Sequence, residues 1–67
     1  MPISVKAVAS GDGWDVTIQN NSDKPAKSVQ LVINGQVVSF GGLPAGNRKS
    51  MAVKTNNGMD LQKFVYK

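Results

Sequence analysis

The four aspartates are the only acidic side chains of this 67-residue chain, which contains no glutamate, histidine or cysteine. Covalent and acid-base catalysis depend heavily on the missing types. Asp12 and Asp15, in "GDGWD", could share a cation such as calcium, but a calcium site needs a further oxygen-rich segment, so we assign the pair to a turn. Lys49 and Ser50 cannot form a dyad, because adjacent strand residues point to opposite faces. The sequence predicts a non-enzymatic protein without catalytic residues, metal or cofactor.

Trp14 is the first of two places where an aromatic side chain could bind a ligand. A lone tryptophan beside a glycine-rich turn can stack on a sugar ring, which would make this chain a carbohydrate-binding module. Trp14 also shares the face of a predicted strand with Val16 and Ile18, and a chain with one Trp and two Phe needs its large side chains in the core. We prefer the core assignment.

The second place is the C-terminal "KFVYK", where Lys63 and Lys67 flank Phe64 and Tyr66. Basic residues interleaved with aromatics are typical of barrels that bind single-stranded nucleic acid. The two aromatics could equally pack against neighbours across a sheet. A small basic β-barrel that binds nucleic acid is therefore an alternative, with these four residues as its surface.

The net charge of +4 is spread along the chain, and only Arg48 and Lys49 are adjacent basic residues. Scattered lysines are typical of a solvated surface more than of an anion-binding face. No apolar run has the roughly 18 residues needed to span a membrane, and the first residues lack the apolar region of a signal peptide. The start "MPISVKAVAS" also fits an excerpt of a larger protein. The absence of cysteine fits a reducing compartment and an exported domain alike.

Alternation of apolar and polar residues, interrupted by turn formers, predicts six short strands in one domain that covers residues 1–67. A domain of this size has a stability margin of a few kcal/mol. The last segment, "MDLQKFVYK", could form a helix, but we prefer a strand because every other element is β. The predicted strands lie in residues 3–9, 14–19, 28–33, 36–40, 50–55 and 59–67, and the turns in 10–13, 20–25, 41–47 and 56–58.

The stretch "SVQLVINGQVVSF" is an explicit β-hairpin, because Asn34-Gly35 suits the two positive-φ positions of a type I′ turn. This turn fixes the register. The predicted pairs are Ile33/Gln36, Val32/Val37, Leu31/Val38 and Val29/Phe40, and the predicted core face consists of Val29, Leu31, Ile33, Val38 and Phe40. Val32 and Val37 then meet on the other face, where they could form a contact surface or could simply reflect the strand preference of β-branched residues.

From Val16 to Thr55 the order of features resembles the compact immunoglobulin-like domains of exported bacterial and archaeal proteins, including adhesion-type modules. The resemblance implies an all-β fold, a small antiparallel immunoglobulin-like β-sandwich of about six strands, and a role in binding or spacing outside the cytoplasm. The matching residues are Val16, Ile18, Asn20, Ser22, Pro25, Leu43, Gly46, Met51 and Val53.

We therefore expect a non-catalytic binding or spacer module of an exported or cell-surface bacterial protein. Its partner would be another protein or a neighbouring domain of a parent chain. The expected contact surface is the pair Val32 and Val37 with Arg48 and Lys49. An unpaired edge strand could also support a homodimer.

Overall fold

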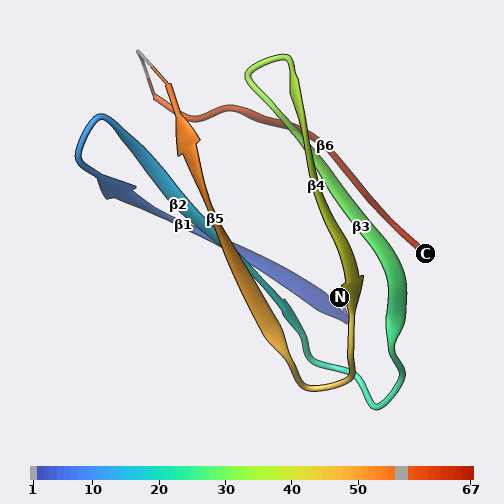
Figure 1. The fold of residues 1–67 in the computed structure, drawn as a ribbon. Coiled ribbons are helices and arrows are strands. Elements are labelled where there is room, and N and C mark those ends of the chain that lie inside the picture. Colours follow the sequence, from blue (N-terminus) through green and yellow to red (C-terminus); the bar gives the residue numbers. More distant parts are fainter. Residues whose placement is uncertain (1, 56–57) are drawn as a thin grey trace.

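The computed structural model describes residues 2–55 and 58–67, and within them the chain forms six antiparallel strands and no helix (Figure 1). The strands form two three-stranded sheets, with the orders β1-β2-β5 and β4-β3-β6. The predicted small β-sandwich is confirmed, and the last segment is a strand. The strands are β1 (Ile3–Ser10), β2 (Gly13–Asn20), β3 (Ala26–Ile33), β4 (Gln36–Leu43), β5 (Arg48–Lys54) and β6 (Leu61–Tyr66).

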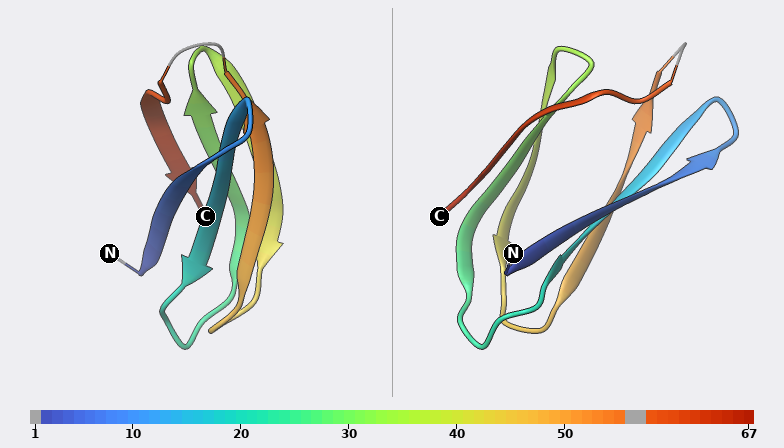
Figure 2. Two further views of the ribbon diagram at one scale, coloured as in Figure 1. Left: turned by 90° about the vertical axis from the view of Figure 1, so that its left-hand side faces the viewer. Right: turned by 180° about the vertical axis from the view of Figure 1, so that it is seen from behind.

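Two hairpins supply the frame of the sandwich, one for each sheet. β1 pairs with β2, and β3 pairs with β4. The chain then crosses to the first sheet to add β5 beside β2, and returns to add β6 beside β3. In the right-hand view of Figure 2 the strands β3, β4 and β6 lie on the left and β1, β2 and β5 on the right. β1, β5, β4 and β6 are consequently edge strands.

The core lies between the two sheets, because alternate residues of each strand point inward. Both sheets contribute, and all five residues predicted for the core face of the hairpin are buried. Burial of such side chains is the main stabilising term for a domain without disulfides. The buried apolar residues are Ile3, Val16, Ile18, Ala26, Val29, Leu31, Ile33, Val38, Phe40, Leu43 and Val53.

The hairpin turn follows the prediction. Asn34 and Gly35 have φ values of 50° and 81°, as a type I′ turn requires. Three of the predicted pairs, from Ile33/Gln36 to Leu31/Val38, are also present. Local turn chemistry therefore sets the register for the first half of this hairpin.

The predicted pair Val29/Phe40 is wrong, because Val29 lies opposite Gly41 across an irregularity in the ladder. Gly41 has a φ of 71°, which a side chain rarely tolerates. A β-bulge adds one residue to a strand and changes which residues face the core. Here it allows Phe40 and Leu43, three positions apart, both to be buried.

Asn20 is the one buried polar residue among those described, and it joins three segments at one end of the sandwich. Its Nδ2 donates to the carbonyl oxygens of Lys24 (2.8 Å) and Leu43 (3.1 Å). Its Oδ1 accepts from the Ser22 amide (3.0 Å) and hydroxyl (2.7 Å). Its main chain bonds to Asn47 and Gly46 of the loop between β4 and β5. Asn20 therefore fixes the crossover from one sheet to the other.

Candidate functional site

The outer face of the β4-β3-β6 sheet carries a row of side chains that includes two of the expected contact residues. Val32 lies between Val37 of β4 and Lys63 of β6. Val37 is 66% exposed and Val32 is half-buried. Val32 and Val37 are the second pair counted from the Asn34-Gly35 turn. Such a pair is not hydrogen-bonded, and its side chains approach most closely. The predicted valine pair thus exists and reaches solvent.

A second row lies beside the first, where Gln30 stands between Ser39 of β4 and Val65 of β6. Val65 is 37% exposed. We call the two rows together, Val32, Val37, Val65, Gln30, Ser39 and Lys63, the valine face. Its uncharged centre and single lysine are suited to contact with another protein.

The outer face of the other sheet has a different chemistry. Thr17 and Ser50 lie opposite each other on β2 and β5, and their hydroxyl oxygens are 2.8 Å apart in a hydrogen bond. Lys6 is the neighbour of Thr17 on β1. The one large exposed apolar residue described on this face, Val8, lies opposite Asp15. Because the exposed valines of the valine face are two and lie on one sheet, that face is the stronger candidate for a contact surface.

Arg48 and Lys49 lie on β5, in the other sheet, so the structure does not place them on the valine face. Lys49 pairs with the buried Ile18 and therefore stands on the inner side of its edge strand. Its Nζ donates to the main-chain oxygen of Phe40 on β4, at 3.2 Å. Lys49 thus links the adjacent edges of the two sheets.

The four residues of the alternative nucleic-acid surface separate by strand alternation. Phe64 lies opposite Leu31 and Tyr66 opposite Val29, on the core side of β6, whereas Lys63 faces outward beside Val32. The two aromatic rings contact each other, with centroids 5.5 Å apart and planes tilted by 60°. Phe64 packs against the core. The aromatic and basic side chains of β6 therefore do not form one interleaved surface.

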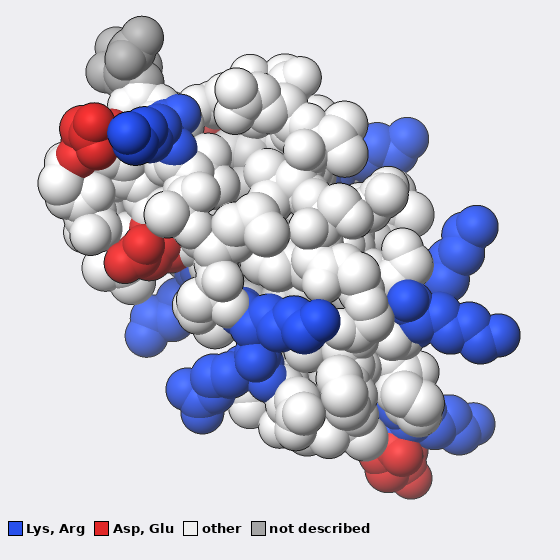
Figure 3. All heavy atoms as spheres, in the orientation of Figure 1, with Lys and Arg blue, Asp and Glu red and all other residues white. Residues whose placement is uncertain are grey.

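Basic side chains project from several sides of the molecule in Figure 3 and do not converge on one patch of the face shown. An anionic polymer is held by several cations along one track. The described residues contain no group of three or more His, Cys, Asp or Glu placed to hold a metal ion. Within the same residues, no helix has the length and apolar character that would let it cross a membrane.

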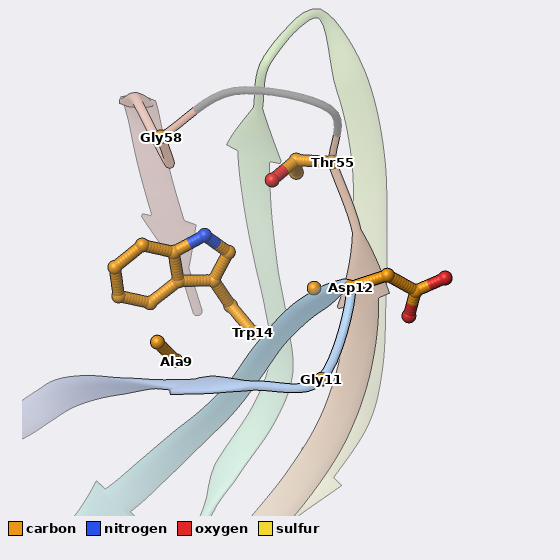
Figure 4. A pocket seen from close by; sticks show the side chains of 7 residues that line it. Ala9, Gly11, Asp12, Trp14, Thr55 and Gly58 are labelled. Carbon is orange, nitrogen blue, oxygen red and sulfur yellow. The ribbon is translucent and has the colours of Figure 1, made fainter.

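Trp14 is half-buried, packs against the edge of the core, and borders an open hollow of about 450 Å³ at the end of the β1-β2 hairpin. Figure 4 shows the indole between Ala9 and Gly58, with the Thr55 hydroxyl directed toward it. The Asp12 side chain points away from the ring. Trp14 thus has one side in the core and one side accessible.

Sequence reasoning missed Val65, Gln30 and Ser39 as parts of the candidate surface. They join the predicted valine pair only because β6 pairs with β3, and no local pattern specifies which strand the last segment joins.

Comparisons of the chain with models of protein families, with curated proteins and with solved structures give no match.

Proposed function

We propose that this protein is a non-catalytic protein-binding or spacer module, of the kind found in exported or cell-surface bacterial proteins, and that the valine face is its contact surface. The observation that carries the proposal is the pair of the exposed Val37 and the half-buried Val32, extended by the exposed Val65 across the sheet. Apolar side chains that a small domain leaves exposed as a group are typical of interaction sites. An edge strand offers a second means of contact, including homodimerisation.

The strand order supports the immunoglobulin-like assignment. In that fold the first, second and fifth strands share one sheet, and the third and sixth pair in the other. The same pairs occur here as β1-β2-β5 and β3-β6. Here β4 pairs with β3, whereas the fourth strand of a constant-type domain pairs with the fifth.

Sedimentation velocity with a mixed single-stranded oligonucleotide tests the proposed class of partner. We expect mixing to leave the sedimentation of the protein and of the oligonucleotide unchanged, at low and at moderate salt. The reason is that Lys63 lies on the opposite face of the sheet from Phe64 and Tyr66. Co-sedimentation that weakens steeply as salt rises would instead show counterion release from a nucleic-acid complex. That result would replace the proposed function with the nucleic-acid alternative.

A carbohydrate-binding module is a second candidate, favoured by the hollow beside Trp14. We expect the tryptophan emission to shift to the blue on folding, because the indole packs partly against the core. We also expect a panel of neutral oligosaccharides to leave the emission of the folded protein unchanged. A saturable change with one of them would favour the carbohydrate module and contradict the proposed protein-binding role of the domain.

A further inference from the structure

β6 is an edge strand with a regular segment that is open to a further strand. Natural sheets block their edges with inward-pointing charges, bulges and proline. The β5 edge has the inward Lys49 and the β4 edge has the bulge at Gly41, whereas β1 pairs regularly over its whole length and carries Lys6 on its outer side. β6 has an irregularity of its own between Leu61 and Lys63, but from Lys63 to Tyr66 it pairs regularly with β3.

β6 also has an unusual share of exposed apolar surface. Leu61, Val65 and Tyr66 are three of the six large apolar residues that are exposed among those described. Tyr66 lies on the core side of the sheet and is nevertheless 40% exposed. The inner side of β6 therefore lacks part of the cover that the rest of the core has.

The free hydrogen-bonding groups of this edge can be identified from the ladder. The Lys67 amide donates to Ser28 of β3 at 2.9 Å, so the main-chain groups of Lys67 face β3. Because these groups alternate along a strand, those of Phe64 and Tyr66 face away. In the described chain β3 is the one strand beside β6. Phe64 and Tyr66 thus present free donors and acceptors to a further strand.

We propose that β6 pairs antiparallel with β6 of a second copy of this chain, with the two-fold axis at Phe64, so that two β4-β3-β6 sheets join into one six-stranded sheet. This proposal rests on the proposed function, because the dimer supplies a partner for a domain that acts through protein contacts. In this register each Phe64 meets its symmetry mate, and an aromatic pair across two strands is stabilising.

Overlap and charge together select this register, because an axis at Gln62 or at Tyr66 would pair at most three residues of each β6. Lys63 is the sole charged residue between Leu61 and Tyr66. With the axis at Phe64, Lys63 faces Val65 of the partner subunit. An axis at Lys63 would place two lysines opposite each other, and an axis at Val65 would place Lys63 opposite Lys67 of the partner subunit. Like charges directly opposite destabilise a strand pair, so the Phe64-centred dimer is the self-complementary one.

Opposite charge changes at Val65 test both the dimer and its register. We expect wild-type protein to show a monomer–dimer equilibrium in sedimentation equilibrium, and to dimerise more tightly as salt rises, because each copy carries +4. Val65→Glu places a carboxylate opposite Lys63 of the partner subunit twice per dimer, whereas Val65→Lys places an ammonium group there. The Lys variant should dimerise at least about tenfold more weakly than the Glu variant.

Val8→Glu and Val8→Lys are the matched controls, because Val8 is an exposed valine on the outer face of β1, in the other sheet and away from both the valine face and the proposed axis. The two variants carry the same net charges as their Val65 counterparts, and their dimer dissociation constants should differ much less. Circular dichroism of all four variants verifies that each is folded. A wild-type chain that stays monomeric up to about 1 mM would overturn the dimer. So would a ratio of dimer dissociation constants, Lys variant to Glu variant, that is the same at Val65 and at the control position. A monomer would leave the protein-binding proposal intact, since that proposal is contradicted by oligonucleotide or sugar binding.

Discussion

Asn20→Asp should leave most of the protein unfolded at neutral pH. The change is almost isosteric, but it replaces the Nδ2 donor with an anionic oxygen that would face the carbonyl oxygens of Lys24 and Leu43. The site is 1% exposed, so the charge cannot be solvated. We expect a loss of about 3 kcal/mol or more in the free energy of unfolding, measured by urea denaturation. A domain of 67 residues has little more than this in total.

The pH dependence of this variant gives a second readout. Burial raises the pKa of the introduced carboxyl group in the folded state above the value of about 3.9 that it has in the unfolded chain. A group whose folded pKa is raised stabilises the fold below its unfolded pKa, and that stability is lost as pH rises. Asn20→Asp should therefore be most stable below about pH 4, where the protonated acid can donate one of the lost hydrogen bonds. Stability independent of pH would contradict this account.

Asn21→Ala is the matched control for Asn20. The Asn21 side chain donates to the Ser4 hydroxyl at 3.1 Å in an exposed position. Because water replaces such a bond, the variant should stay within about 0.5 kcal/mol of the wild type. An equal loss in the free energy of unfolding for Asn20→Asp and Asn21→Ala would show that the loop tolerates no change. The four side-chain hydrogen bonds of Asn20 would then have no special role in stability.

Local rules explain how much of this fold could be predicted. The Asn34-Gly35 turn fixes its hairpin because the φ values of two residues decide the register of their neighbours. That reasoning fails after Gln30, where the pairing depends on the need to bury both Phe40 and Leu43. A bulge satisfies this need, and strict alternation from the turn cannot show where it lies.

The candidate surface shows the same limit at longer range. Val32 and Val37 could be paired from the sequence because two turn residues separate their strands. Arg48 and Lys49 follow the hairpin closely in sequence, but the loop after β4 carries them to the other sheet. The pairing of β6 with β3 is equally non-local, so sequence alone could not add Val65 to the valine face. Strand neighbours across a sandwich are set by packing of the whole core.

Gly13→Ala should lower the midpoint of thermal unfolding by about 8 °C or more. Gly11 and Gly13 look alike in "SGDGW", yet they serve different purposes. Gly11 has a φ of 60° and makes the turn. At Gly13 an added Cβ would lie 2.3 Å from the main-chain oxygen of Val53 on β5. Since that oxygen belongs to a paired strand, the clash can be relieved only by separating β2 from β5, at a cost of about 2 kcal/mol.

Gly42→Ala provides the comparison, because an added Cβ there has its nearest neighbour, the Lys27 oxygen, at an ordinary 3.5 Å. Gly42 is exposed and is not among the glycines with a positive φ. Alanine at such a position restricts the unfolded chain, so the variant should be as stable as the wild type or more stable by about 0.4–1 kcal/mol. Differential scanning calorimetry of both variants measures the contrast. If Gly13→Ala unfolded at the same temperature as Gly42→Ala, the close approach of β2 and β5 at Gly13 would not constrain this fold. The pairing of Gly13 with Lys54 would then have to be looser in solution.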